Sequence, residues 1–356
     1  MTAASSGCRT ARLTAPGRFD LGWEPVPQPV AGSSLIRVSA VGLCGSDLHW
    51  YGSGSIGDAV LQEPLVLGHE IAGTVEGGPR HGLRVAVDPA IPCQTCPSCR
   101  RGHANLCPAV LFAGHGTTDG GLRELMTWPD AQLYPLPERV SDTAGAVLEP
   151  LGVAVHAVDL GHVRAGATTA VVGCGPIGLL LLQVLRAIGA GGALAVEPLA
   201  HRRAAALAFG ADVAVGPDDV DGTGTVPEEG VDVAFEVTGS SAAAEVAMRL
   251  ARPGGRVVLV GIPEDDLTVF PASLARRKGL TVALSRRMGE VYPRALRLVE
   301  RGLVDVESLV THRFALTEVA AAFRCAAERE GLKVLVSPAA ADPHKAAAGG
   351  AEPNAD

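Results

Sequence analysis

The chain has 356 residues and a formal net charge of −8. A single hydrophobic core rarely grows beyond ~250–300 residues, so this length predicts two domains. The acidic balance provides no basic field for nucleic acid or for an anionic membrane surface, and we expect neither class of partner. The expected partners are small molecules or further copies of the same chain.

The N-terminal sequence and the cysteines indicate a cytoplasmic protein. The first twenty residues lack the continuous apolar stretch of a secretory signal. Thiols stay reduced in the cytosol, which favours metal binding over disulfide formation. The most apolar run, residues 170–190, is interrupted by Gly173, Gly175, Pro176 and Gly178. A membrane-spanning helix would be continuous, so we interpret this run as a buried strand that leads into a helix.

The pattern of apolar runs divides the chain into four parts and predicts an α/β fold. Residues 1–150 hold short apolar runs between glycines and prolines, such as SLIRVSAVGL, EIAGTVEG and LRVAVDP, as in a β-rich, barrel-like domain. Residues 151–287 alternate apolar runs with Ala- and Leu-rich stretches, which predicts a doubly wound parallel sheet covered by helices. Residues 288–337 contain two amphipathic helical stretches and a closing strand, KVLVSP. Residues 338–356 are poor in large apolar side chains and are predicted to be disordered.

Four cysteines lie within fifteen residues in PCQTCPSCRRGHANLC, at Cys93, Cys96, Cys99 and Cys107. Four thiolates can close the tetrahedral shell of a structural zinc ion. The alternatives are disulfides, which a reducing compartment disfavours, and an iron–sulfur cluster, whose usual spacings differ. The segment therefore predicts a structural zinc site, with His103 as a bystander.

Cys44, His69 and Glu70 form a second candidate metal site, in GLCGSDLHWY and LVLGHEIAG. Zinc prefers thiolate and imidazole ligands, and three protein ligands leave one position for water or substrate, as in catalytic zinc sites. Cys44 and His69 are twenty-five residues apart, so only the fold can bring them together. A lone cysteine is more often a packed core residue, and from these residues alone both interpretations stay open.

A glycine-rich loop between an apolar run and a helical stretch predicts a dinucleotide site, with candidate contacts at Gly173, Gly175, Pro176, Ile177 and Gly178. Such glycines allow a tight turn and close approach of the backbone to a pyrophosphate at a helix N-terminus. Glu197 ends the next apolar run nineteen residues later, where a carboxylate would bind the adenosine ribose.

The charges near Glu197 bear on the choice of cofactor. A carboxylate at this place would repel a 2′-phosphate, which favours NAD over NADP. Arg202 and Arg203 follow five and six residues later. They either compensate that charge, with Arg202 as a candidate cofactor contact, or lie on a solvated helix face. We expect NAD, with NADP as the alternative.

Several fragments taken together resemble one enzyme family. CGSDLHWY, LGHE, the four-cysteine segment, LEPLGVAVHA and GCGPIG occur in the order and spacing of the zinc-dependent medium-chain alcohol and polyol dehydrogenases. The stretch DLHWYGSGSIGDAVLQEPLVLGHEIAGTV most resembles sorbitol dehydrogenases and L-idonate 5-dehydrogenases. This resemblance implies a GroES-like catalytic domain beside a Rossmann domain, two Zn²⁺ ions per chain, and a homodimer or homotetramer.

The resemblance also implies roles for individual residues. Cys44, His69 and Glu70 become the surroundings of the catalytic zinc, and Glu149 in VLEPLG becomes a further ligand, acting directly or through water. Asp47 would orient His69, as outer carboxylates do at zinc sites. The remaining roles are a proton relay and substrate binding, assigned respectively to Ser46 and His49, and to Tyr51 and Arg287.

The expected reaction is NAD-linked oxidation of a secondary hydroxyl of a sugar acid, with L-idonate to 5-keto-gluconate favoured. The alternatives are a neutral polyol such as sorbitol, xylitol or a butanediol, and a non-catalytic nucleotide-binding relative. Two features depart from the polyol branch. Arg286 and Met288 flank Arg287 where aromatic residues are usual, and the loop FAGHGTTDGGL is shorter than in L-idonate enzymes.

Overall fold

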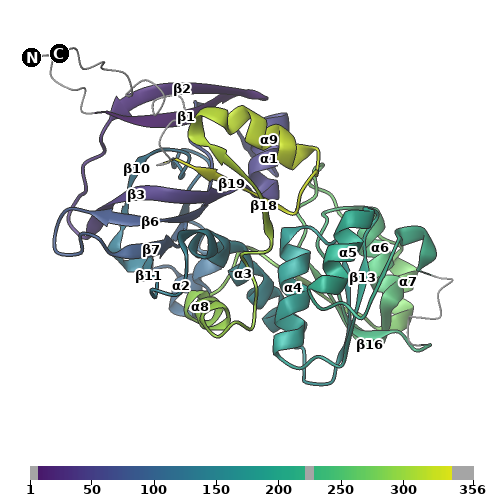
Figure 1. Cartoon of the computed structure of the whole chain (residues 1–356). Coiled ribbons are helices and arrows are strands. Elements are labelled where there is room, and N and C mark those ends of the chain that lie inside the picture. The colour runs from purple at the N-terminus through teal and green to yellow at the C-terminus, as the bar shows by residue number, and fades with distance from the viewer. Residues whose placement is uncertain (1–6, 221–227, 339–356) are drawn as a thin grey trace, which may run out of the picture.

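The computed structural model describes residues 7–220 and 228–338. These residues form two units that lie side by side, one β-rich and one in which helices cover a parallel sheet (Figure 1). The α/β class and the two-unit architecture expected from the sequence are thereby confirmed. The predicted disordered tail lies outside the described residues beyond Pro338, and the three boundaries between the predicted parts stay predictions.

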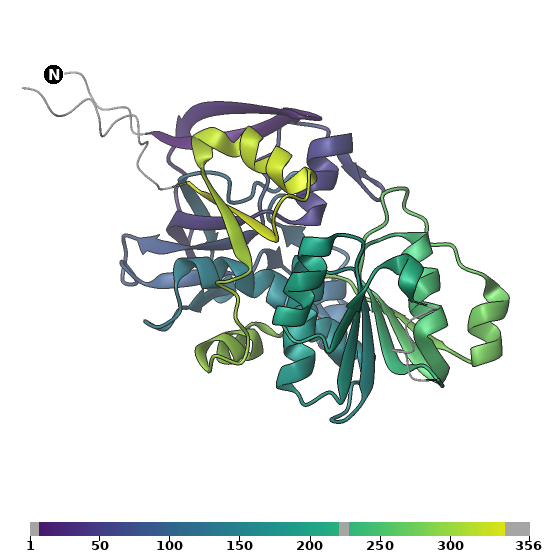
Figure 2. The ribbon, with the colours of Figure 1, turned by 45° about the vertical axis from the view of Figure 1, so that its right-hand side comes forward.

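The β-rich unit is built on a seven-stranded sheet of order β11-β7-β6-β3-β19-β18, with β10 also paired to β3. Its strands come from both ends of the chain, because β18 and β19 follow the other unit in sequence (Figure 2). The elements of the N-terminal part are β1 (Gly7–Ala15), β2 (Arg18–Pro25), β3 (Ser33–Gly42), α1 (Gly45–Ser53), β4 (Ser55–Ile56), β5 (Ala59–Val60), β6 (Glu70–Glu76), β7 (Arg84–Val87), β8 (Ala90–Ile91), α2 (Pro97–Arg100), η1 (Ala104–Leu106), β9 (Leu111–Phe112), β10 (Leu125–Pro129), η2 (Asp130–Gln132) and β11 (Leu133–Pro135).

The second unit is a six-stranded parallel sheet of order β14-β13-β12-β15-β16-β17. Alternate residues of its strands enter two separate cores, because helices cover both faces. The strand order reverses at β12, so a ligand crevice is expected at the carboxyl ends of β12 and β15. The elements are β12 (Thr168–Val172), α4 (Pro176–Ala187), β13 (Gly192–Val196), α5 (Ala200–Ala208), β14 (Val213–Val215), η3 (Pro217–Asp219), β15 (Val231–Glu236), α6 (Ser241–Leu250), β16 (Ala251–Leu259), α7 (Ala272–Lys278) and β17 (Thr281–Leu284).

The long helix α3 (Asp142–Gly161) connects the two units and spans the predicted boundary between residues 150 and 151. Ser141 caps its N-terminus by accepting a hydrogen bond from the amide of Ala144 at 3.0 Å. The helix packs against β6 and β7 on one side and α4 on the other. It is long and apolar enough to cross a membrane, but 78% of its apolar window is buried inside the molecule. We therefore interpret it as a core helix.

The C-terminal segment returns from the parallel sheet to the β-rich unit. It contains α8 (Tyr292–Glu300), β18 (Val310–Ala315), η4 (Leu316–Glu318), α9 (Val319–Ala327) and β19 (Lys333–Ser337). The hydroxyl of Tyr292 donates to the carbonyl of Val87 at 2.8 Å, which fastens α8 to β7. Helix α9 lies beside α1 (Figure 1), and β19 pairs with β3. The return thus brings C-terminal side chains close to α1 and β6.

Candidate active site

Cys44, His69 and Glu70 converge at the junction of three elements. Cys44 is the N-cap of α1, His69 precedes β6, and Glu70 is its first residue. One ligand atom from each residue lies within 4.8 Å of those of the other two. His69 and Glu70 are buried, and Cys44 is half-buried. The fold therefore brings together the three residues proposed around a catalytic zinc, and their thiolate, imidazole and carboxylate donors fit that ion.

Asp47 and Ser46 contact the two nitrogens of the His69 ring. Asp47 Oδ1 lies 3.4 Å from Nδ1, and Ser46 Oγ lies 3.4 Å from Nε2. Asp47 is fully buried and also accepts hydrogen bonds from the amides of Cys44 (3.0 Å) and Gly68 (3.1 Å). These contacts hold the carboxylate against Nδ1, so Nε2 is the nitrogen available to a metal ion.

Charge reinforces this arrangement. Burial alone would raise the pKa of Asp47, but His69 and the two backbone hydrogen bonds outweigh it, and the pKa is lowered. Burial has the opposite effect on His69 and by itself would lower the pKa of the imidazole. The Asp47 carboxylate more than compensates, and the pKa of His69 is raised well above its ordinary value. Asp47 therefore remains ionised and able to accept the Nδ1 proton.

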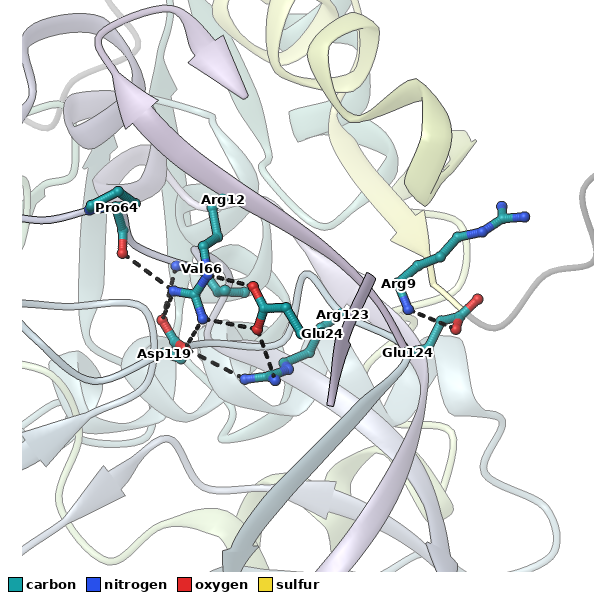
Figure 3. Close-up of polar contacts among 8 residues, drawn as sticks. All are labelled: Arg9, Arg12, Glu24, Pro64, Val66, Asp119, Arg123 and Glu124. Atoms are coloured by element: carbon teal, nitrogen blue, oxygen red, sulfur yellow. Dashed lines mark hydrogen bonds and ion pairs between the residues drawn. The ribbon is translucent and has the colours of Figure 1, made fainter. Parts of the chain in front are cut away.

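The segment that precedes His69 is held by an ion-pair network (Figure 3). Residues 120–122 pair through their backbone with residues 66–68. Asp119 accepts from the amide of Val66 at 3.1 Å and from Arg12 Nη2 at 2.7 Å. Arg12 also bonds Glu24 in β2, at 3.0 Å from Nη2. Through these bonds the β1–β2 hairpin fixes residues 66–68, which directly precede His69.

Glu70 is paired with a buried lysine from the C-terminal strand. Lys333 Nζ lies 2.6 Å from Oε1 and 2.5 Å from Oε2, and it donates to the carbonyl of Leu43 at 2.8 Å. The side chains of Lys333 and Glu70 are each only 1% exposed. Gly42 makes room for this pair, because a Cβ there would lie 1.9 Å from Glu70 Oε2. Sequence reasoning missed Lys333, since nothing in its local pattern marks it.

Replacing Lys333 by Met is expected to lower the free energy of unfolding by about 3–5 kcal/mol, because it leaves a buried carboxylate without its counter-ion. Denaturant unfolding of the purified protein measures this loss. The matched control is Arg37→Ala, which removes the exposed Arg37–Glu76 pair (2.6 Å) and should cost no more than about 1 kcal/mol. Equal losses in the two variants would show that Lys333 is not the counter-ion of Glu70.

Glu149 lies on α3 beside this group and is 4% exposed. Burial raises its pKa to about 7, with Glu70 adding to the rise and His69 and Lys333 opposing it. Among the described residues, the group whose ligand atoms all lie within 4.8 Å of one another contains Cys44, His69 and Glu70 but not Glu149. Its predicted role, as a ligand directly or through water, stays a prediction.

The four cysteines of the second cluster also converge. Their sulfur atoms lie within 4.8 Å of one another, and none is in a disulfide. Sulfurs accept backbone hydrogen bonds, from Cys96 N to Cys93 Sγ (3.3 Å) and from Cys99 N to Cys96 Sγ (3.4 Å). Hydrogen bonds from Thr95 and Cys96 lower the pKa of Cys93 to about 6. Four free sulfurs at one point fit a closed tetrahedral zinc site.

The glycine loop has the geometry of a dinucleotide site. Gly173 adopts φ +101°, and a Cβ there would lie 2.4 Å from the Thr238 side chain. A Cβ at Gly178 would lie 2.0 Å from the carbonyl oxygen of Gly173, so the helix can approach the strand only without one. Gly175 is the N-cap of α4. A Cβ added at Gly175 would lie 3.8 Å from its nearest neighbour, Arg202 Nη1. This leaves open space at the helix N-terminus, where a pyrophosphate binds.

Glu197 lies at the expected place, at the end of β13, and supports the loop directly. Its Oε2 accepts from the amide of Cys174 at 2.8 Å, and its Oε1 accepts from Leu199 at 3.0 Å. Arg202 reaches toward the same loop, and its buried Nε has no hydrogen-bond partner in the described part of the chain. Arg203 instead donates to the carbonyls of Glu197 and Pro198. Of the two arginines, Arg202 is the one that lies near the glycine loop, and its cofactor contact stays a prediction.

Comparisons with known proteins match both units. Residues 30–138 match the alcohol dehydrogenase GroES-like domain, and residues 176–301 match the zinc-binding dehydrogenase family. The sorbitol dehydrogenase of Bacillus subtilis is 32% identical over 88% of this chain and 92% of its own length. That of Homo sapiens is 34% identical over 90% and 93%. The chain belongs to the zinc-dependent medium-chain alcohol and polyol dehydrogenases.

Solved structures agree with this assignment. A putative zinc-binding dehydrogenase from Sinorhizobium meliloti, bound to NADP, superposes with a TM-score of 0.86 at 32% identity, over 94% of this chain and all of that one. L-Idonate 5-dehydrogenase from Escherichia coli superposes with the same TM-score at 25% identity, over 93% and 98%. Sorbitol dehydrogenases are thus nearer in sequence than this L-idonate enzyme, and the expected L-idonate specificity is not confirmed.

Arg287, the predicted substrate-binding arginine, is separated from His69 by the Phe112 ring, and its role in substrate binding stays a prediction. Its guanidinium lies 4.3 Å above the Phe112 ring, whose centroid is 5.3 Å from that of His69. Arg287 has φ +54°, a left-handed conformation that is unusual for a bulky residue. Burial, with repulsion from Arg286, lowers its pKa to about 10. Asn105 of the four-cysteine segment donates a hydrogen bond to the carbonyl of Arg286 at 3.0 Å. This bond connects the backbone next to Arg287 to the four-cysteine segment.

His115 is a candidate site residue that sequence reasoning missed. It lies in the loop after β9, half-buried, with its ring centroid 5.5 Å from that of Trp50. Burial and the nearby Arg287 and Arg286 lower its pKa, which keeps the imidazole neutral. The shortened loop was the only signal in the sequence, and it identified no particular residue.

The remaining predicted residues lie on α1. Ser46 and His49 are both half-buried and are separated by three positions, which places them on the same helix face. Tyr51 packs its ring against Phe323 (5.0 Å between centroids) and Phe19 (5.7 Å). A substrate contact from Tyr51 would therefore have to come from its hydroxyl, and all three roles stay predictions.

Exchange of Glu197 for Ser should relax the discrimination against NADP at least tenfold, because it removes a ribose hydrogen bond and a repulsive charge. The ratio of kcat/KM with NAD to that with NADP measures this effect. Because Glu197 also supports the loop, Glu197→Gln serves as the control that keeps the side-chain length and an acceptor for Cys174. If the wild-type enzyme prefers NADP, the assigned role of Glu197 is wrong.

Proposed function

We propose that this dehydrogenase oxidises a secondary hydroxyl of a sugar acid, with L-idonate to 5-keto-gluconate favoured and NAD as the acceptor. One observation carries the substrate class: Arg287 Nη1 is buried beside the site and has no hydrogen-bond partner among the described residues. A buried donor without a partner costs free energy. A substrate carboxylate would satisfy it, since a guanidinium can bind a carboxylate through two parallel hydrogen bonds.

The side chains of the site suit alcohol oxidation. When bound, zinc supplies a positive charge that lowers the pKa of an alcohol, and nicotinamide accepts a hydride. Asp47 holds His69 in the orientation needed for metal binding. The hydroxyl of Ser46 lies 3.4 Å from His69 Nε2 and can accept the proton of the substrate hydroxyl as it passes on its own proton. His49, whose imidazole can both accept and donate a proton, can pass that proton toward solvent.

A neutral polyol is the second candidate. The sorbitol dehydrogenases among the relatives favour it, as does the structural similarity to 2R,3R-butanediol dehydrogenase from Bacillus subtilis (TM-score 0.82, 30% identity). In that case Arg287 would bind hydroxyl groups. A non-catalytic nucleotide-binding relative is the third and weakest candidate, because each residue type that the reaction needs is present.

Replacing Arg287 by Ala should raise the KM for L-idonate by about 10- to 150-fold, which corresponds to ~1.5–3 kcal/mol for a charge-assisted hydrogen bond. The KM for sorbitol should change much less. Arg286→Ala is the matched control, because Arg286 is the exposed neighbour and should affect neither substrate. Equal losses on both substrates in Arg287→Ala would favour the polyol candidate.

We also infer a homodimer or homotetramer in the cytoplasm. Strand β17 is the edge of the parallel sheet, and its last residue, Leu284, is 76% exposed. Open sheet edges are sites where a second copy can pair. All eight cysteines lie in the described part of the chain, and all are free thiols, as expected in a reducing compartment. A monomer in sedimentation analysis would contradict the assembly.

A further inference from the structure

A third group of metal-ligand residues lies on the C-terminal segment, in addition to the two zinc clusters. His312 is on β18, Cys325 is on the last turns of α9, and Glu330 follows that helix. One ligand atom from each lies within 4.8 Å of those of the other two. Cys325 is buried, His312 is half-buried, and Glu330 is exposed. The group is therefore anchored in the protein and open to solvent on one side.

The end of α9 brings two of these residues together. Arg329 adopts a left-handed conformation (φ +57°), its amide bonds the carbonyl of Ala326, and the amide of Glu330 bonds the carbonyl of Cys325. This pattern of two bonds is the Schellman motif, which normally places two apolar side chains in contact at the positions of Cys325 and Glu330. Here a thiol and a carboxylate occupy those positions, and no apolar contact explains the pairing.

The third residue, His312, is oriented by its surroundings. Its Nδ1 lies 2.9 Å from the hydroxyl oxygen of Thr311, which also accepts from the amide of Leu332 at 3.0 Å. The turn packs closely on this edge of the ring, since a Cβ at Gly331 would lie 2.3 Å from Nδ1. Nδ1 is thus occupied by the protein. Nε2 remains as the nitrogen for a ligand, an arrangement usual for metal-binding histidines.

The charges of the group also suit a cation. A divalent cation would displace the proton of the Cys325 thiol. The resulting thiolate and the Glu330 carboxylate together balance two positive charges, and an imidazole ligand adds none. Sulfur and nitrogen donors select zinc-like ions over magnesium or calcium.

We propose that His312, Cys325 and Glu330 form a third divalent metal site, for Zn²⁺ or a cation of similar softness such as Co²⁺. Three protein ligands leave a fourth position for water. The site also touches the cofactor unit, because the carbonyl of Gly331, next to Glu330, accepts a hydrogen bond from Arg202 at 3.3 Å. A bound ion would therefore fix the turn that contacts the cofactor-side arginine.

The test is a zinc titration of the full-length protein. After dialysis against zinc-free buffer without a chelator, the retained zinc is counted, and Zn²⁺ is then added in competition with a chromophoric indicator. The wild type is expected to bind one equivalent beyond the retained zinc. His312→Asn and Cys325→Ala should lose that equivalent, and Glu330→Gln should weaken it at least tenfold. Glu328→Gln, an exposed neighbour, is the matched control and should bind as the wild type does.

Cobalt gives an independent signal. Co²⁺ added to the zinc-containing wild type, in which the other two sites stay filled, should produce a thiolate-to-cobalt charge-transfer absorption band that is absent in Cys325→Ala. Cys8→Ala, which removes a buried thiol of β1, should leave the band unchanged. Should Cys325→Ala fail to fold, His312→Asn and Glu330→Gln decide the outcome through the zinc titration. The same number of zinc equivalents in the wild type and in His312→Asn would overturn the proposal.

Discussion

Replacing Cys44 by Ser is expected to lower kcat of the dehydrogenase by at least about 10³-fold, because metal ions supply several kcal/mol of charge stabilisation at such centres. Cys44 provides the thiolate of the group formed with His69 and Glu70. A serine hydroxyl at neutral pH is a poor zinc ligand, so the metal should be lost or misplaced. Steady-state NADH formation measures the change.

The Cys44→Ser protein should otherwise resemble the wild type. An open catalytic site contributes less to folding than a closed structural one, so the thermal midpoint and NADH binding should change little. Zinc content should fall by one equivalent per chain. Cys8→Ser controls for loss of a thiol elsewhere in the β-rich unit. Full activity in a Cys44→Ser protein whose metal content has been measured would disprove the assignment.

Replacing Cys99 by Ala is expected to have its main effect on stability. It opens the four-sulfur shell, and loss of a structural metal belongs to the few mechanisms that cost more than about 4 kcal/mol in a single substitution. Thermal unfolding and zinc analysis should both respond, with zinc falling by one equivalent. A zinc content equal to that of the wild type after the same dialysis would contradict the structural role.

The same variant should also weaken substrate binding. Asn105 in the four-cysteine segment donates a hydrogen bond to the carbonyl of Arg286. Disorder of this segment would therefore release the backbone that positions Arg287. A rise in KM for L-idonate is therefore expected at temperatures where Cys99→Ala is still folded. Cys8→Ala is the control, because it removes a buried thiol outside the four-cysteine segment. An unchanged KM in Cys99→Ala would show that the four-cysteine segment does not position the substrate-binding residues.

Much of the fold was predictable because its strands and helices have strong local patterns. The apolar runs SLIRVSAVGL and EIAGTVEG form β3 and β6, the start of the run at residues 170–190 lies in β12, and the glycine loop leads into α4 as expected. Helix α3 was not identified as an element, since Pro150 and two glycines interrupt a pattern that tertiary packing then overrides. The short strand β14 has too few residues for a recognisable period.

The candidate site was predictable where spacing or resemblance marked it, as for the four cysteines and for Cys44 with His69. It was not predictable where long-range folding creates the contact. Lys333 meets Glu70 across 263 positions of sequence, and only the pairing of β19 with β3 brings them together. His115 was missed for a similar reason, because the position of a loop side chain depends on packing against other elements.

The central claim is that the protein is a zinc-dependent, NAD-linked dehydrogenase of a sugar acid. The most direct measurement is the rate of NADH formation with L-idonate and with sorbitol, before zinc removal, after it, and after zinc is restored. We expect NADH formation only in the zinc-containing protein, with a higher kcat/KM for L-idonate than for sorbitol. Turnover that persists without zinc, or a higher kcat/KM for sorbitol, would contradict the claim.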